Sequence, residues 1–598
     1  MYKIIKLLFC LLTKRQRRQF YLLQIMVVIM AFTEILGVVS IIPFMALVGD
    51  MNLLQQNNII SNVYKISGIT SESNFVLALG TGVLLILLFS AMFSMFTTWR
   101  LALYANKVGV EIADRLYEYY LNKEWLFHAL RSSAEFTKKI SYETARVTNG
   151  LLLPLLQMNA RVVLAFFMSL TLFIYNTEVA LVGLSIFIFA YYFLYKIVRI
   201  RLHSNGKIIS DVNEDRFRLM NEGFGGIKDI LLLGRDKSLI NKFGQTGDKL
   251  AYSQGANEGL AHVPRFLMEL AAYGCMISLV LYLVATHDSN IGIILPILSV
   301  YALAGFKLLP AFQQIYVCTT RIRGNIAAFE SIQEDLANSL QTRNQNENTE
   351  VEPITFKNEL ILEDIVFRYP NKSEPVLNKL NITIPVNSTI GLVGKSGSGK
   401  STIIDIILGL IEPDHGFLKI DNKVINGKNS RNWQKNIGFV PQHIFLSEGT
   451  IAENIAFGVE KKDIDIDRVN QTLELAHLSS LIKSFENGIQ SKIGERGVQL
   501  SGGQRQRVGI ARALYHDADV LIFDEATSAL DGITEKMIMS AIDKYKGTKT
   551  IILIAHRLKT IQRCDKILVI EKGYVTDQGS YADLINRNES FKKMSNHA

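Results

Sequence analysis

The sequence predicts a two-part molecule, in which an all-α membrane domain of six apolar helices precedes a soluble α/β domain. Long apolar runs occupy residues 20–320, and the polar stretch NSLQTRNQNENTEVEP (338–353) lacks any periodicity. The residues after it alternate between short apolar strands and helices. We therefore expect a membrane domain over 1–336, a linker over 337–355 and a soluble domain over 356–598.

Six apolar segments can each supply the roughly 20 residues that a membrane-spanning helix needs. They cover about 20–48, 74–99, 151–175, 178–195, a segment ending in 271–285, and 291–318. The stretch RLALYANKVGVEIADRLYEYYLNKEW keeps helical apolar spacing without a proline or glycine cluster, so the helices should run well past the membrane. We expect short crossing segments at 125–137 and 222–234.

The distribution of Lys and Arg predicts the orientation of these segments. Only Lys65 is basic between the first two segments, whereas Arg100–Lys139 holds seven basic residues and Lys196–Lys249 holds eleven. By the positive-inside rule, both termini and the soluble domain should lie in the cytoplasm, with the spans in the inner, cytoplasmic membrane. The net charge of +9 lies largely beside apolar segments, which favours anionic phospholipid over nucleic acid as its partner.

The soluble half contains a phosphate-binding loop in its required setting. The strand-like STIGLV is followed by GKSGSGKST (394–402) and then by the helical IIDIILGL. Glycines let backbone N–H groups close around phosphates, and the helix N-terminus adds a favourable potential. Lys400 should reach the β- and γ-phosphates, and the Ser401 hydroxyl should bind Mg²⁺. The residues assigned to nucleotide binding in this loop are Gly394, Ser396, Gly397, Gly399, Lys400, Ser401 and Thr402.

A second motif, DVLIFDEATSALD, places Asp524 and Glu525 at the end of an apolar strand. Ligands of open α/β sheets bind at the carboxyl ends of the strands. We therefore expect Asp524 to contact Mg²⁺ and Glu525 to act as the base that activates water. The less specific interpretation is that the two carboxylates are merely solvated.

The stretch LSGGQRQRVGIARAL (500–514) resembles the signature of the ATP-binding cassette (ABC) family. That resemblance implies roles for three further residues. Tyr369, in FRYP, is similar to the aromatic residue that stacks on adenine. Gln442, in VPQHIF, resembles the loop glutamine that contacts Mg²⁺ and water. His556, in IAHRL, resembles the switch histidine near the γ-phosphate.

The resemblance covers nearly the whole chain and implies an exporter-type half-transporter with ATP and Mg²⁺ as cofactors. The stretch SALD, which ends in Asp531, is similar to the loop that crosses the dimer interface. Glu495 precedes the signature, as a glutamate does in exporters. Neither Glu525 nor His556 is replaced, which favours a homodimer with two working sites over a heterodimer. The residues expected to contact the nucleotide held by the other copy are Ser501, Gly502, Gly503 and Gln504.

The charged residues singled out in or beside the apolar segments are Glu34, Arg265, Glu269 and Lys307. A charge costs roughly 2.5–3.5 kcal/mol at mid-membrane. Counting inward from the turn at 287–290, Glu269 lies about 27 Å, Arg265 about 33 Å and Lys307 about 25 Å deep. Glu34 should lie nearer the middle or the outer half. One interpretation is structural, with Glu269 paired to Arg265 or to Lys307. The other is that Arg265 and Lys307 offer positive charge to a lipid phosphate or pyrophosphate.

Three short motifs sharpen the second interpretation. A glutamate in the first segment followed by IPFMALVGD, with VPRFLMEL in the fifth segment and FKLLP in the sixth, resembles bacterial flippases for lipid-linked oligosaccharides. The resemblance implies ATP-driven flipping of a polyprenyl-pyrophosphate-linked glycan. The alternatives are an exporter of lipids, drugs or peptides, a soluble-type ABC ATPase, and an ATP-gated channel. Six apolar segments disfavour the soluble ATPase, and the intact Glu525 favours turnover over gating.

Overall fold

The computed structural model describes residues 2–49, 51–54, 59–175, 177–286, 291–343, 352–370, 372–494, 497–526, 532–554 and 558–596. The chain divides into two compact units. The first comprises Met1–Lys123 with His128–Glu347, and the second comprises Glu124–Phe127 with Asn348–Ala598. The first unit is helical and the second is α/β, which confirms the predicted combination of domains.

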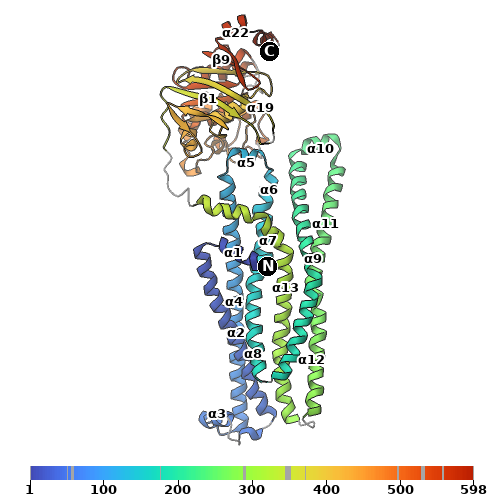
Figure 1. Ribbon diagram of the computed structural model, residues 1–598. Coiled ribbons are helices and arrows are strands. Elements are labelled where there is room, and N and C mark those ends of the chain that lie inside the picture. The colour runs from blue at the N-terminus through green and yellow to red at the C-terminus, as the bar shows by residue number, and fades with distance from the viewer. Residues whose placement is uncertain are drawn as a thin grey trace. The chain divides into compact units, whose positions relative to one another are not determined.

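Long helices dominate the first unit and run side by side within it (Figure 1). They are α2 (Lys14–Gly49), α4 (Glu72–Leu121), α8 (Leu153–Tyr175), α9 (Thr177–Gly225), α11 (Asp236–His262), α12 (Pro264–Thr286) and α13 (Ile291–Arg343). The short helices are α1 (Tyr2–Leu11), α3 (Ile59–Ser67), α6 (Ser133–Thr137), α7 (Thr144–Val147) and α10 (Ile227–Leu233). Helix α5 (Trp125–Ala129) begins in Glu124–Phe127, which belongs to the second unit. There are also a 3₁₀ turn at Met51–Leu54 and π-helical segments at Lys138–Glu143 and Thr148–Leu152.

Several of these helices are suited to a membrane. Within the described residues, four stretches are long and apolar enough to cross one: Lys14–Val48, Glu72–Leu121, Ser133–Ile174 and Asp236–Leu281. Helices α9 and α13 occupy the positions of the predicted fourth and sixth spans. The count of six spans is consistent with these helices and stays a prediction.

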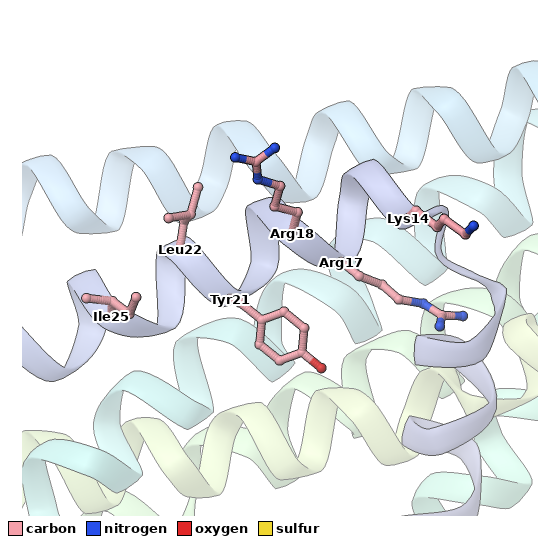
Figure 2. Close-up of a pocket in the computed structure, with 6 residues that line it drawn as sticks. All are labelled: Lys14, Arg17, Arg18, Tyr21, Leu22 and Ile25. Atoms are coloured by element: carbon pink, nitrogen blue, oxygen red, sulfur yellow. The ribbon is translucent and has the colours of Figure 1, made fainter.

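The start of α2 combines basic and apolar side chains on one surface (Figure 2). The residues that line this shallow groove are Lys14, Arg17, Arg18, Tyr21, Leu22 and Ile25. The Arg17 guanidinium donates to the carbonyl oxygens of Cys10 at 2.6 Å and Leu12 at 3.1 Å, which ties the end of α1 to α2. Basic residues followed by exposed aromatic and aliphatic ones are typical of a helix that enters the headgroup region.

Helices α9 and α13 cross where their backbones touch. A Cβ atom on Gly206 would lie 2.4 Å from the carbonyl oxygen of Gly324, so only glycine fits there. Arg146 of α7 bridges this crossing by donating to the carbonyl oxygens of Gly206 and Gly324, each at 3.3 Å. It also donates to the Ser210 hydroxyl at 2.7 Å and pairs with the fully buried Glu143 at 3.0 Å. One side chain therefore connects α7, α9 and α13.

The second unit contains two β-sheets. The strands are β1 (Glu359–Phe367), β2 (Leu377–Pro385), β3 (Thr389–Val393), β4 (His415–Ile420), β5 (Lys423–Ile425), β6 (Ile437–Val440), β7 (Val520–Asp524), β8 (Thr550–Ile554), β9 (Lys566–Glu571) and β10 (Tyr574–Gly579). Strands β2, β1, β4 and β5 form an antiparallel sheet in that order. The other sheet has the order β10-β9-β3-β8-β7-β6, in which only the β10–β9 pair is antiparallel.

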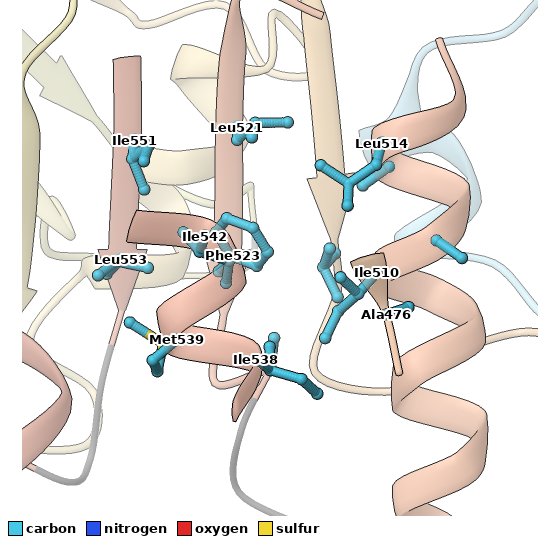
Figure 3. Close-up of a cluster of buried hydrophobic side chains, with 14 of the residues drawn as sticks. Ala476, Ile510, Leu514, Leu521, Phe523, Ile538, Met539, Ile542, Ile551 and Leu553 are labelled. Atoms are coloured by element: carbon cyan, nitrogen blue, oxygen red, sulfur yellow. The ribbon is translucent and has the colours of Figure 1, made fainter. Parts of the chain in front are cut away.

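Helices surround these sheets and pack on them through buried apolar side chains. They are α14 (Lys400–Ile407), α15 (Ser430–Gln434), α16 (Ile451–Ile455), α17 (Ile466–Leu475), α18 (Ser479–Lys483), α19 (Gly502–Tyr515), α20 (Gly532–Asp543), α21 (Leu558–Ile561), α22 (Tyr581–Arg587) and α23 (Glu589–Asn596). Figure 3 shows side chains of α19 and α20 around Leu521, Phe523, Ile551 and Leu553 of β7 and β8. Because β7 and β8 are covered on both faces, they appear in the sequence as continuous apolar runs.

Two predicted connections can be compared with the structure. The crossing segment at 125–137 contains α5 and α6. Leu126 belongs to the second unit and packs against its cluster of buried side chains around Leu360 and Ile403. The segment at 222–234 contains α10, whose C-terminal Gly234 adopts φ +62°. Helix α13 continues to Arg343, past residue 337 where the sequence predicts the linker to begin. The stretch SIQEDLANSLQTR contains no proline or glycine that would end the helix earlier.

We predict that Gly206→Ala destabilises the helical unit. The added methyl group would meet the Gly324 carbonyl oxygen, and overpacking of this kind typically costs about 1–3 kcal/mol. Thermal unfolding of the purified protein should show a midpoint lowered by several degrees. Gly255→Ala in α11 is the matched control, because nothing lies within 4 Å of the added atom. An unchanged midpoint for Gly206→Ala would show that the crossing is not tightly packed.

Candidate functional site

The phosphate-binding loop joins β3 to α14 at the centre of the six-stranded sheet. Gly397 and Gly399 have φ of +79° and +106°, a region that L-residues rarely adopt. A Cβ atom on Gly399 would also lie 2.8 Å from Leu377. The loop therefore needs glycine at this position for both backbone conformation and space, and it presents the N-terminus of α14 to the ligand side.

The charge in this loop comes from Lys400, the first residue of α14. Its Nζ donates to the carbonyl oxygens of Gly394 at 2.8 Å and Lys395 at 3.1 Å, so the side chain folds back over the loop. Burial lowers the pKa of Lys400, while the nearby Glu525 and Asp524 act in the opposite direction. An ammonium group in this loop, beside the N-terminus of α14, is suited to phosphate oxygens.

The strand-end carboxylates lie where the sequence predicts. Asp524 ends β7, and Glu525 follows with φ +50°, a left-handed conformation that is unusual for glutamate. The Glu525 backbone N–H donates to the Ile554 carbonyl oxygen of β8 at 3.1 Å, which holds this geometry. Gln442, two residues beyond β6, donates from Nε2 to Glu525 Oε2 at 2.8 Å. Residues from adjacent strands thus converge at one edge of the sheet.

Tyr369 lies beside the first turn of α14. Its hydroxyl is 3.3 Å from the Thr402 hydroxyl, and its ring packs edge-on against Phe367 with centroids 5.0 Å apart. This position is consistent with the predicted stacking on adenine, which stays a prediction.

The signature forms the N-terminus of α19. Ser501 is the N-cap residue: its hydroxyl accepts from the Gln504 N–H, and the Gln504 side chain accepts from the Ser501 N–H. Ser501 is exposed, and Gly502 and Gly503 are partly exposed. The positive end of a 14-residue helix is therefore open at the surface. The predicted site residues Asp531 and His556 lie outside the described residues, as does Glu495.

The donor set fits ATP and Mg²⁺. The Ser398 hydroxyl in the loop is buried and has no hydrogen-bond partner among the described groups, as expected of a group that binds a ligand. Ser401, Gln442 and Asp524 offer the oxygen ligands that Mg²⁺ prefers. The described residues contain no cluster of three or more His, Cys, Asp or Glu side chains suited to a metal. Such a sparse protein ligand set is normal where phosphates complete the coordination of Mg²⁺.

Comparison with known proteins agrees with this geometry. Residues 377–528 match the family of the ABC transporter, and residues 39–306 match the ABC transporter transmembrane region. The chain belongs to the ABC transporters. It is a half-transporter of the exporter type, which carries one membrane domain and one ATP-binding domain. A bacterial Atm1-family ABC exporter with ATP bound has the same fold, with a TM-score of 0.78 and 20% identity over 97% of this chain and 98% of that one.

Several related proteins are named ATP-dependent lipid A-core flippase. The one from Vibrio parahaemolyticus is 42% identical over 238 residues, which are 40% of this chain and 41% of that protein. The proteins from Cupriavidus metallidurans and Vibrio cholerae are each 28% identical; the matches cover 81% and 88% of this chain, and 81% and 89% of those proteins. This ABC transporter thus spans less than half of the first relative and most of the other two.

In the membrane domain of this ABC transporter, Arg265 and Glu269 form an ion pair. The Arg265 Nε donates to Glu269 Oε1 at 2.7 Å, with the arginine side chain 62% exposed. An i, i+4 pair on one face of α12 explains this contact without any neighbouring helix. Most of the Arg265 side chain remains exposed.

Lys307 pairs with Glu34 instead of Glu269. The Lys307 Nζ lies 3.4 Å from Glu34 Oε2, and the Ser94 hydroxyl donates to Glu34 Oε1 at 2.9 Å. Glu34 is buried, with 6% of its side chain exposed, whereas 40% of the Lys307 side chain is exposed. Of the two pairings expected for Glu269, the structure therefore has the one with Arg265, and Lys307 has a different carboxylate partner. Depth counting cannot show which helices are neighbours, and α13 packs on α2 and α8 through small residues such as Ala31 and Ala304.

One charged residue of the membrane domain, Arg161, is not among those singled out from the sequence. Arg161 lies on α8, within the third apolar segment, and lines a cavity with residues of three other helices. The available signal was an arginine flanked by LLLPLLQMNA and VVLAFFMSLTLF, since intramembrane charges usually mark function.

We predict that Lys307→Gln lowers thermal stability more than the double substitution Glu34→Gln with Lys307→Gln. The single change leaves a buried carboxylate without its counter-ion, whereas the double change removes both charges. Unfolding midpoints of the purified protein in detergent measure the difference. Arg265→Gln, at an exposed pair, serves as the control and should change the midpoint little. Equal midpoints for single and double variants would contradict the assigned pairing.

We predict that Glu525→Gln lowers ATP hydrolysis at least about a hundredfold and leaves ATP binding intact. The substitution removes the base but keeps the shape of the side chain. Lys400→Ala should instead weaken ATP binding itself, because it removes the charge over the loop. Phosphate release and binding of a fluorescent ATP analogue separate the two effects. Full hydrolysis by Glu525→Gln would refute the assigned role of Glu525.

Proposed function

We propose that this protein is an ATP-driven flippase or exporter of a lipid-linked substrate, namely a polyprenyl-pyrophosphate-linked oligosaccharide. The observation that supports ATP-driven turnover most directly is the contact of Gln442 with Glu525 at the strand end beside the phosphate loop. A base positioned at this edge serves hydrolysis, whereas nucleotide binding alone does not require one. The names of the relatives support a lipid-linked substrate class.

The residues of the ATP site have separable tasks. Lys400 and the loop N–H groups hold the phosphates, and Glu525 orients a water molecule and accepts its proton. Ser401, Gln442 and Asp524 would hold Mg²⁺, which neutralises charge on the phosphate oxygens when bound. Gln442 contacts the base directly, so a movement of its loop changes the position of Glu525.

We propose that the working unit is a homodimer in the inner membrane, with both termini and the ATP-binding domains in the cytoplasm. The exposed Ser501 and the open N-terminus of α19 suit a phosphate contact supplied by a second copy. ATP would then contact both copies and hold the two ATP-binding domains together. Its hydrolysis would remove the shared contact and release them, because the two states bind the nucleotide differently.

The charges in the membrane domain support a phosphate-bearing substrate. Arg265 is more exposed than its partner Glu269, and its fork can bind two oxygens at once. Lys307 and Glu34 lie on neighbouring helices and supply a second polar position. An exporter of drugs or peptides would use the same ATP site. The substrate class therefore has to be identified by a transport measurement.

Transport in proteoliposomes tests the proposed function. With ATP, a fluorescent polyprenyl-pyrophosphate-linked oligosaccharide should become accessible on the other leaflet. The Glu525→Gln substitution should abolish this movement. We predict that Arg265→Ala lowers the rate at least about tenfold, because hydrogen bonds to charged groups are worth about 1.5–3 kcal/mol. Lys237→Ala in α11 is a matched control, since it removes an exposed charge of the same unit.

Two outcomes would contradict the proposal. A wild-type rate for Arg265→Ala would remove that residue from substrate binding. ATP-dependent movement of a drug or peptide, with none of the glycan, would replace the proposed substrate class by the alternative.

A further inference from the structure

A cavity of about 140 Å³ lies within the membrane domain, among α2, α4, α8 and α13. It is lined by Met30, Thr98, Leu101, Gln157, Ala160, Arg161 and Gln314. A water molecule requires roughly 10–15 Å³ measured in the same way, so the cavity has room for a larger polar group. Its lining combines an arginine, two amides and a hydroxyl with the apolar side chains of Met30 and Leu101.

Arg161, the cation in this cavity, differs from Arg265 and Lys307 in its lack of a carboxylate partner among the described residues. Arg265 and Lys307 each have a carboxylate partner, Glu269 and Glu34. No ion pair or hydrogen bond of the described residues includes Arg161, whose side chain is partly exposed. An unneutralised guanidinium inside an apolar bundle is costly and therefore calls for an anion.

The polar groups around Arg161 offer more donors than the protein uses. The Gln314 Nε2 lies 3.4 Å from Gln157 Oε1, which leaves the Gln157 amide N–H₂ without a partner among the described residues. A group with several acceptor oxygens would satisfy these donors together.

The cavity also adjoins the Lys307–Glu34 pair. Met30 precedes Glu34 by one turn on α2, and Thr98 follows Ser94 by one turn on α4, which places the cavity about 6 Å from the pair along the helices. Gln314 follows Lys307 by two turns on α13, in the same direction. The two sites form a polar column at the contact of α2, α4 and α13.

We propose that this cavity binds the phosphate group of an amphiphile, with Arg161 as the charged ligand. The guanidinium fork matches two phosphate oxygens, and the Gln157 and Thr98 side chains can reach others. Met30, Leu101 and Ala160 supply apolar contact for the attached chain. This inference rests on the proposed function in one respect, namely that the phosphate belongs to a lipid-linked molecule. Its test measures binding and not transport.

Titration of the full-length protein in a maltoside detergent tests the site. Excess MgADP is present throughout, so that the nucleotide loop does not take up the added phosphate. The probes are hexyl phosphate, inorganic phosphate and hexanoate, and calorimetry gives each Kd. We expect hexyl phosphate to bind, with a Kd raised at least about tenfold in Arg161→Gln. Arg161→Lys keeps the charge but loses the fork, and should give an intermediate Kd.

The relative affinities of the three probes identify the ligand. Tighter binding of hexyl phosphate than of inorganic phosphate identifies a lipid-linked phosphate as the ligand, whereas equal binding identifies free phosphate. Binding of hexanoate as tight as that of hexyl phosphate would contradict a phosphate site. So would an unchanged Kd in Arg161→Gln, or no binding by the wild type. A normal rise of the unfolding midpoint with MgATP shows that each variant is folded. If Arg161 binds hexyl phosphate but no lipid-linked glycan is transported, this site stands and the proposed function fails.

Discussion

The stability of the membrane domain depends on where its charged side chains lie within an apolar helix bundle. A charged group away from water needs a partner, because the desolvation cost is otherwise not offset. Lys307 and Glu34 meet this requirement between two helices, and Arg265 and Glu269 meet it within one. Among the residues that the structure describes, Arg161 has no such partner, which makes its cavity the natural place for an external anion.

The ATP-binding domain depends on a different constraint, the precise course of the backbone. Gly399 and Glu525 both adopt positive φ, one at the start of α14 and one just after β7. Glycine adopts this region freely, whereas the strained conformation of Glu525 persists only where surrounding contacts fix it, here through its hydrogen bond to Ile554. The parallel strands bring the two positions to the same edge of the sheet, although about 125 residues separate them in the sequence.

The sequence predicted the ATP site better than the charges of the membrane domain, for a physical reason. A loop such as GKSGSGKST determines its own conformation, so Lys400 and Ser401 could be placed from local residues. The pair Arg265–Glu269 was similarly accessible from i, i+4 spacing. Lys307–Glu34 depends on which helices pack together, and residue counting along each helix carries no information about lateral neighbours. The position of Arg161 within an apolar segment was visible in the sequence, whereas the cavity that it lines was not, because its lining comes from four helices.

The contacts of Arg146 have a consequence for sequence divergence. On α9 and α13 this side chain binds the carbonyl oxygens of Gly206 and Gly324, which are present whatever side chains occupy those helices. Relatives could therefore exchange most surface residues of both helices, and with them the molecules that they recognise, without losing this connection. Two glycines and one arginine would then be enough to keep the architecture constant while specificity evolves.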